Sequence, residues 1–150
     1  PDFQGNEMAL KTIIHGAPDV INHNIETVHR LYPTVRPQAG YRRSLNLLQR
    51  VDLSAPSTST KSGLMLGLGE TREEVLKTLE DLRGVHCRML TLGQSLQPSQ
   101  HPLPVVRYVP PQEFDAYRKT ALSMGFDQVA SGPMVRSSYQ AENLYHRLGE

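Results

Sequence analysis

Apolar residues follow two patterns that alternate along the chain. Short runs of consecutive apolar residues are typical of buried β-strands, and apolar residues that recur every three or four positions are typical of helices with one buried face. Alternation of the two patterns indicates βα units and a parallel sheet. The sequence therefore predicts an α/β fold, and its 150 residues have the length of a single domain, residues 1–150.

Four short strands are expected. They are Val20 to His23, Lys61 to Leu66, Arg88 to Leu92 and Gln128 to Ala130. In a parallel sheet such strands all end at the same edge, where the loops that lead into the helices converge. We therefore expect the residues that follow the strands to lie on one rim.

Five helices are expected between and around these strands. They are Glu7 to His15, Tyr41 to Val51, Arg72 to the residue before Gly84, Pro111 to Met124, and Ala141 to Leu148. In the second of them Tyr41, Leu45, Leu48 and Val51 share one apolar face. The segment from Asp52 to Ser59 is expected to be the loop that leaves this helix.

The clearest helix boundary lies at Thr71-Arg72-Glu73-Glu74. This pattern is a capping box, in which the Thr71 hydroxyl and the Glu74 carboxylate each accept a hydrogen bond from the other residue's backbone N–H. Gly84 is expected to follow the same helix as its C′ residue. The third helix therefore has both a start signal and a stop signal.

The fourth helix follows a proline-rich segment. Gln97 to Pro111 contains five prolines, which lack the N–H donors that a regular central element needs, so we expect a long, stiff surface loop. Pro111 suits the first turn of the helix, and Gly125 suits its end. The positions expected to be buried in this helix are Phe114, Tyr117, Leu122 and Met124.

A polar cluster follows each predicted strand. The clusters are Asn22-His23-Asn24 with Glu26-Thr27, Gly67-Leu68-Gly69-Glu70, Gly93-Gln94 and Ser131-Gly132-Pro133. Ligands of parallel α/β folds bind where the carboxyl ends of the strands meet the helix N-termini. Four clusters in corresponding positions therefore indicate a shared pocket.

The turn after the second strand is the most informative of these clusters. Gly67 and Gly69 tolerate positive φ and carry no Cβ, so their backbone N–H groups can approach a ligand closely. Glu70 adds a carboxylate, which suits a hydroxylated or cationic ligand better than a phosphate. Glycine after a strand is also ordinary turn chemistry, and that alternative stays open here.

Other polar residues have structural interpretations as well. The Asn22-His23-Asn24 cluster fits an Asx turn, and His23 has no partner at metal-ligand spacing, which favours a hydrogen-bonded structural histidine. We expect Cys87 to be an inert buried thiol because it precedes an apolar strand. Arg136-Ser137-Ser138-Tyr139 lies beyond the last strand and is either part of the rim or a polar turn.

Composition narrows the function classes. The net charge is +1 with Lys and Arg scattered, so we expect no nucleic-acid partner and no membrane partner. The one cysteine excludes a disulfide framework within the chain and a multi-cysteine metal site built from it alone. The chain has neither a run of roughly 18 apolar residues nor a leader signal, which predicts a soluble intracellular protein. A first residue of Pro1 suggests a processed chain or a fragment.

Seven segments form an ordered series of motifs. They are P-D-F-Q-G from Pro1, N-H-N-I-E-T from Asn22, T-K-S-G-L-M-L-G-L-G-E from Thr60, L-T-L-G-Q from Leu90, L-Q-P-S from Leu96, L-P-V-V-R-Y from Leu103 and S-G-P-M-V-R-S-S-Y from Ser131. In this order they resemble the lipoyl synthase family over essentially the whole chain. Motifs of this length distinguish that family from other radical S-adenosylmethionine enzymes.

The resemblance implies an activity, its cofactors and a fold. The activity is the insertion of two sulfur atoms at carbons 6 and 8 of a protein-bound octanoyl chain. The cofactors are S-adenosylmethionine, a 4Fe–4S cluster that cleaves it, and a second 4Fe–4S cluster that donates the sulfur. The fold is a partial parallel (β/α) barrel, the second half of a radical-SAM (β/α)6 barrel, with a C-terminal extension.

The resemblance also implies roles for individual residues. The family's Arg-Ser-Ser-Tyr motif supplies a serine ligand to the second cluster, and this serine falls on Ser138 rather than Ser137, with Arg136 and Tyr139 orienting it. The residues implied around S-adenosylmethionine are Asn22, Asn24, Glu26, Lys61, Ser62, Gly67, Glu70, Gln94 and Arg136. Carboxylate or neutral acceptors suit its ribose, and Lys, Arg or Ser donors suit its carboxylate.

The chain departs from the family pattern in its cysteines. The family binds its clusters through two cysteine triads nearer the N-terminus, and Cys87 matches neither of them. We therefore expect the C-terminal half of such an enzyme, inactive by itself. Ser95 is a smaller departure, because the family commonly has a bulkier residue there.

Partners and location are also implied by the resemblance. The partners are an octanoylated lipoyl carrier protein or lipoyl domain and an electron donor such as ferredoxin or flavodoxin. The location is the bacterial cytoplasm, or a plastid or mitochondrion in a eukaryote.

Two alternatives to this function stay open. One is a non-catalytic module that binds the carrier protein or a partner chain through the proline-rich segment and Arg107-Tyr108. The other is an unrelated α/β enzyme with a sugar or nucleotide at the rim.

Overall fold

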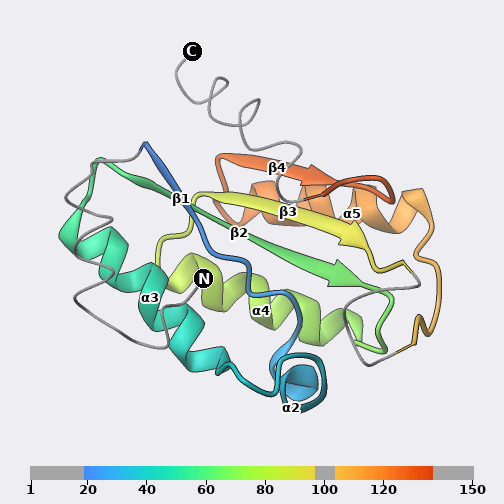
Figure 1. Ribbon diagram of the computed structural model, residues 1–150. Helices are drawn as coiled ribbons and strands as arrows, with labels where there is room; N and C mark the ends of the chain where they lie inside the picture. Colours follow the sequence, from blue (N-terminus) through green and yellow to red (C-terminus); the bar gives the residue numbers. More distant parts are fainter. Residues whose placement is uncertain (1–18, 97–103, 137–150) are drawn as a thin grey trace.

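The computed structural model describes residues 19–96 and 104–136. Their four strands form one parallel sheet in chain order (Figure 1). The strands are β1 (Val20–Asn22), β2 (Ser59–Leu66), β3 (Met89–Gln94) and β4 (Gln128–Ser131). The α/β fold and the four predicted strands are therefore confirmed, with each strand end within two residues of its expected position.

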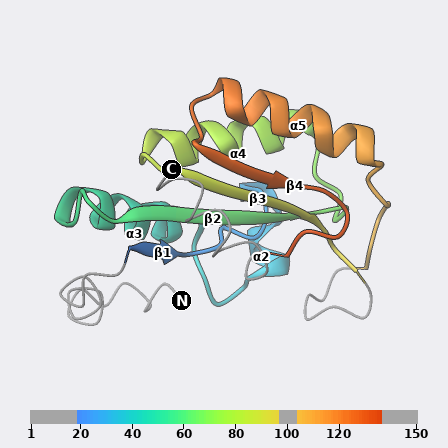
Figure 2. The ribbon, with the colours of Figure 1, turned by 90° about the horizontal axis from the view of Figure 1, so that it is seen from above.

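Three longer helices connect the strands. They are α3 (Tyr41–Ser54), α4 (Arg72–Gly84) and α5 (Pro111–Ser123). When each parallel strand lies beside its predecessor, right-handed connections all cross on the same side of the sheet. Apolar residues of all three helices join those of β2 and β3 in one core cluster, and Figure 2 shows α4 and α5 together along one side. This arrangement is consistent with part of a parallel (β/α) barrel.

Alternation along β2 and β3 gives the sheet two different faces. Leu64, Leu66, Leu90 and Leu92 are fully buried in the core beneath the helices. The opposite face, called the inner face below, carries the alternate residues. On β2 and β3 these are Lys61, Gly63 and Met65, in register with Met89, Thr91 and Gly93.

Two short helical turns after β1 have no counterpart among the predicted elements. They are η2 (His29–Leu31) and α2 (Tyr32–Val35). Segments this short do not display a helical repeat in the sequence. Their buried Tyr32 donates its hydroxyl to the Ile25 carbonyl, which ties the turns to the chain leaving β1.

α3 is longer than expected. The loop predicted to begin at Asp52 begins instead after Ser54, with the Ala55 N–H still bonded to the Val51 carbonyl at 2.8 Å. Asp52 and Ser54 do not break a helix, whereas Pro56 disfavours helical φ and ψ at the residue before it. The proline therefore sets the boundary.

α4 begins as predicted but ends differently. The Glu74 N–H donates to the Thr71 hydroxyl at 3.2 Å, and the Thr71 N–H donates to the Glu74 carboxylate at 2.9 Å, so the capping box is confirmed. Gly84 is the last helical residue rather than the C′ residue, and the left-handed conformation falls on His86, with φ of 63°. The reason is that the N–H groups of His86 and Cys87 still bond to the final turn, so the chain reverses later.

α5 confirms its predicted ends. Pro111 occupies the first turn, and Gly125 follows the helix with φ of 108°. The buried residues are Phe114, Tyr117 and Ala121, and Met124 packs partly against the core. Leu122 is 38% exposed, so the expectation that it is buried was wrong. The spacing from Phe114 and Tyr117 points to Ala121, and Leu122 lies one position around the helix.

Some predictions lie outside the described residues. The predicted helices Glu7 to His15 and Ala141 to Leu148 both do so, as do residues 97–103 of the proline-rich segment. Residues 104–110 are described, and they form no regular element, as expected. Within the described ranges, no helix has the length and apolar character needed to cross a membrane.

The capping box should contribute measurable stability. Thr71→Ala removes the hydroxyl that accepts from the Glu74 N–H, and loss of such a cap costs about 1 kcal/mol. We expect the midpoint of urea unfolding to fall accordingly, while Ser57→Ala at an exposed loop position leaves it unchanged. Equal midpoints for the two variants would show that the box does not stabilise α4.

Candidate functional site

The four polar clusters lie at the same edge of the sheet. Because all four strands are parallel, the residues after Asn22, Leu66, Gln94 and Ser131 share the carboxyl-end rim (Figure 1). The predicted rim is therefore confirmed as an arrangement of the backbone. Which side chains meet there depends on the face to which each one points.

A small cavity opens on the inner face below this rim. It has a volume of about 40 Å³, which is room for a few water molecules. Its lining comes from the loop after β1, from β2 and β3, and from the segment after β4. The residues are Asn24, Glu26, Gly63, Leu64, Met65, Thr91, Gly93 and Val135. Two residues predicted to bind a cofactor, Asn24 and Glu26, therefore meet here.

Glu26 is held in an unusual backbone conformation. Its φ is 73°, a left-handed value that is uncommon for residues other than glycine. Its N–H donates to the Gly63 carbonyl and its carbonyl accepts from the Met65 N–H, both at 2.8 Å. Such outliers persist where the surrounding structure holds them, and they cluster at functional sites. The two bonds keep Glu26 beside the cavity.

Lys61 and Ser62 point to opposite faces. Lys61 lies on the inner face in register with Asn22, and its full burial lowers the pKa of its ammonium group. Ser62 lies on the helix side, where its hydroxyl accepts from the Ile25 N–H at 3.0 Å. Asn22 and Lys61 therefore share the inner face with the cavity without being among its lining residues, and Ser62 points to the other face.

The glycine turn has the predicted backbone conformation, but two N–H groups of the turn bind a side chain of the protein. Gly67 and Gly69 have φ of 97° and 109°, which confirms the expected conformation. The Glu70 carboxylate, however, accepts from the N–H groups of Gly67 and Leu68, both at 3.0 Å. Those amides were expected to approach a ligand. Instead Glu70 reaches back within the turn and binds them.

Gln94 is also bonded within the protein. Its side chain is buried, and its Nε2 donates to the carbonyls of Ser95 at 2.9 Å and Arg107 at 3.1 Å. Its Oε1 accepts from the Val109 N–H at 2.7 Å. Three protein partners therefore surround the amide of a residue that the resemblance placed near the cofactor.

Ser95 is a residue to which the sequence assigned no role. It follows Gln94 and so turns toward the inner face. Its hydroxyl is buried and finds no hydrogen-bond partner within residues 19–96 and 104–136. Its position two residues past the inner-face Gly93 is the signal in the sequence that could have placed it on this face.

The segment after β4 returns over the inner face. A Cβ on Gly93 would fall less than 3.0 Å from the Val135 carbonyl oxygen, so the chain crosses there in close contact. The Arg136 guanidinium lies near the same point, 3.7 Å from that Cβ position, and donates to the Val135 carbonyl at 3.0 Å. Arg136 thus joins the cavity group, and Ser138 lies outside the described residues.

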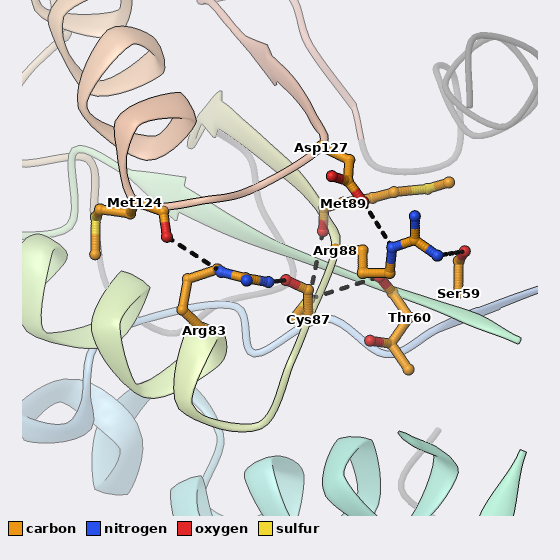
Figure 3. Close-up of polar contacts among 8 residues, drawn as sticks. All are labelled: Ser59, Thr60, Arg83, Cys87, Arg88, Met89, Met124 and Asp127. Carbon is orange, nitrogen blue, oxygen red and sulfur yellow. Dashed lines mark hydrogen bonds and ion pairs between the residues drawn. The ribbon is translucent and has the colours of Figure 1, made fainter. Parts of the chain in front are cut away.

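The described residues do not offer a metal site. No three of their His, Cys, Asp and Glu side chains gather in a way that could hold an ion. Cys87 is fully buried two residues before β3, where its thiol contacts the carbonyls of Thr60 and Met89 (Figure 3). Burial raises the pKa of this thiol to about 12, which fits an inert cysteine.

Comparison with known proteins identifies similar sequences. No family model matches the chain. The chain is 60% identical over 150 residues to the lipoyl synthase of Methylococcus capsulatus, a match that covers 99% of this chain and 47% of that protein. It is 54% identical over 142 residues to the lipoyl synthase of Caldanaerobacter subterraneus, which covers 95% and 50%. It is 59% identical over 143 residues to that of Syntrophotalea carbinolica, which covers 95% and 46%. The chain thus spans about half the length of the curated relatives it matches.

The crossing at Gly93 gives a test of the site. Gly93→Ala adds a Cβ against a backbone oxygen, and overpacking of this kind costs about 1–3 kcal/mol. Gly84→Ala is the matched control, because no atom lies within 4 Å of its new Cβ. We expect urea to unfold Gly93→Ala earlier than wild type and Gly84→Ala no earlier. A wild-type midpoint for Gly93→Ala would contradict the crossing.

Proposed function

The chain belongs to the lipoyl synthase family, and on that premise we propose that it forms the C-terminal half of an enzyme that makes the lipoyl cofactor. The reaction is the insertion of two sulfur atoms at carbons 6 and 8 of a protein-bound octanoyl chain. The observation that carries this proposal is the 54–60% identity to lipoyl synthases over almost the whole chain. The structure supports the proposal through the polar residues that lie on the inner face in and around the cavity.

The inner face carries groups that suit one end of S-adenosylmethionine. When bound, this cofactor supplies the radical that removes hydrogen from the octanoyl chain. Glu26 offers carboxylate acceptors for ribose hydroxyls, with Asn22 and Asn24 as amide partners. Lys61 offers an ammonium group to the methionine carboxylate. The cavity has room for only a few water molecules, so we assign it one end of the ligand rather than the whole molecule.

The pairing of Lys61 with a carboxylate follows from its burial. Removing an ammonium group from water disfavours its charged form, which is why the pKa of Lys61 is lowered. An incoming carboxylate favours the charged form again and forms a charge-assisted hydrogen bond. A buried lysine thus binds an anionic group with little competition from water. Arg136, from the segment after β4, is a second cation close to the same face.

The described residues do not fit a 4Fe–4S cluster. Such clusters are held mainly by cysteine thiolates, and the one cysteine of the chain is buried with a raised pKa. We therefore propose that the cluster cysteines belong to the rest of the parent enzyme and that this chain alone is inactive. Ser138, outside the described residues, is the one cluster ligand that we assign to this chain.

Partners and location belong to the same proposal. The octanoyl chain would arrive on a lipoyl carrier protein or lipoyl domain, and electrons would come from a donor such as ferredoxin or flavodoxin. The compartment would be the bacterial cytoplasm, or a plastid or mitochondrion. The alternative is a non-catalytic module that binds the carrier protein or a partner chain, and the exposed side chains of Val106 and Tyr108 support it.

The proposal is tested on the full-length protein that carries this chain. After anaerobic reconstitution with iron and sulfide, we expect about eight irons per chain, as two 4Fe–4S clusters require. With a reductant, S-adenosylmethionine and an octanoylated carrier, mass spectrometry should show the carrier gaining two sulfurs and 5′-deoxyadenosine forming. Carrier binding without iron or product would favour the binding module instead.

Ser138 gives a separate test of the cluster ligand. Ser138→Ala in the full-length enzyme should perturb the sulfur-donating cluster, because it removes an oxygen ligand. We expect sulfur insertion to stop while cleavage of S-adenosylmethionine continues. Ser137→Ala, the neighbouring serine, is the control and should keep both activities. Unchanged lipoyl product from Ser138→Ala would remove Ser138 from the ligand set.

A further inference from the structure

Gln94 connects two loops of the rim through a buried amide. Its Nε2 donates hydrogen bonds to the carbonyls of Ser95 and Arg107. Its Oε1 accepts a hydrogen bond from the Val109 N–H. Arg107 and Val109 belong to the chain that leads from β3 into α5. The Gln94 side chain thus bonds the segment that precedes α5 to the end of β3.

The side chain of Gln94 points away from the inner face. It follows Leu90 and Leu92 at every second position of β3, and both leucines lie in the core beneath the helices. Its partner Val109 lies in that same core cluster. Gln94 therefore cannot reach a ligand on the inner face, although its neighbours in the sequence, Gly93 and Ser95, turn toward it.

Gly67 receives the same segment from the other side. The Val106 N–H donates to the Gly67 carbonyl at 2.7 Å. A Cβ on Gly67 would lie less than 3.0 Å from both the Gln94 amide nitrogen and the Arg107 carbonyl oxygen. Such a close approach of two backbones requires glycine at this position. The loops after β2 and β3 are thus held together at Gly67 by a backbone hydrogen bond and close packing.

The segment from Val106 to Val109 presents apolar side chains to solvent at the rim. Val106 is 62% exposed and Tyr108 is 68% exposed, whereas Val109 next to them is buried. Met134, in the segment after β4, is a third exposed apolar side chain. Singly exposed apolar side chains are common on protein surfaces and do not by themselves mark a binding site. Here their backbone is held in place by buried hydrogen bonds.

We propose that Gln94 is a positioning residue that holds Val106 to Val109 against the Gly67 turn, and that this segment forms one wall of the entrance for the apolar acyl substrate. This inference rests on the proposed function. Ligands bind parallel α/β folds at the carboxyl-end rim, and the segment that carries Val106 and Tyr108 is one of the loops that form it. Each methylene that leaves water against Val106 or Tyr108 favours binding of the acyl chain. A cofactor bound on the inner face would lie beyond the reach of the Gln94 side chain.

The test uses Gln94→Glu in the full-length, reconstituted protein. The substitution keeps the size of the side chain but turns a carboxylate oxygen toward the carbonyls of Ser95 and Arg107. We expect hydrogen exchange of the 104–109 peptide to become about 10-fold faster. We expect KM for the octanoylated carrier to rise about 5-fold and kcat to change less. The Kd for S-adenosylmethionine should stay within about twofold of wild type.

Three further variants make the outcome decisive. Gln112→Glu makes the same chemical change at an exposed position of α5 and should alter none of these quantities. Gln94→Met, an uncharged side chain of similar size, serves if the glutamate variant does not fold. Gly67→Ala disturbs the contact from its other side, so its effect on exchange should not add to that of Gln94→Met.

Each result has a defined meaning. Unchanged exchange in the 104–109 peptide overturns the positioning role. A loss of S-adenosylmethionine affinity without faster exchange also overturns it, because Gln94 would then contact the cofactor. Faster exchange with an unchanged KM for the carrier overturns the entrance role alone. Wild-type protein that makes no lipoyl product overturns the proposed function and the entrance role with it, while the exchange data still decide whether Gln94 holds the segment.

Discussion

The parallel register of β2 and β3 is the constraint on which the rest of the structure depends. Six residue pairs, from Lys61–Met89 to Leu66–Gln94, align the two strands. This alignment puts the leucines of both strands on the helix side and the glycines on the inner face. A shift of one residue would exchange the two faces and bury Lys61 among the helices. The core and the cavity thus arise from one set of backbone hydrogen bonds.

The loops of the rim are held to this pair of strands by polar groups. Glu26 is bonded at both its N–H and its carbonyl to β2. Arg30, in η2, links this helical turn to the chain after β2, since its guanidinium binds the Gly69 carbonyl and the Glu74 carboxylate. This guanidinium holds the pKa of Glu74 at about 2. The pair is exposed, so it contributes little to stability, but it helps to fix the relative positions of two rim loops.

The sheet has open edges among the described residues. Within residues 19–96 and 104–136, β1 pairs only with β2, and β4 pairs only with β3. Edge strands leave N–H and C=O groups that a further strand can use. The chain covers about half the length of each lipoyl synthase that it matches. In our proposal, this chain supplies groups that bind S-adenosylmethionine, and the rest of the parent enzyme supplies the cluster cysteines.

The sequence by itself determined the α/β fold, the positions of its four strands along the chain, the start of α4 and the common rim. These features follow from local patterns, such as the apolar periodicity and the box formed by Thr71 and Glu74. Motifs in order along the chain also determined the family. Tertiary structure alone decided which polar groups face a ligand. Lys61 and Ser62 are neighbours in the sequence but point to opposite faces, and Gln94 bonds to residues 13 and 15 positions away. The physical reason is that a side chain's face is set by the pairing register, and its partners by contacts between distant segments.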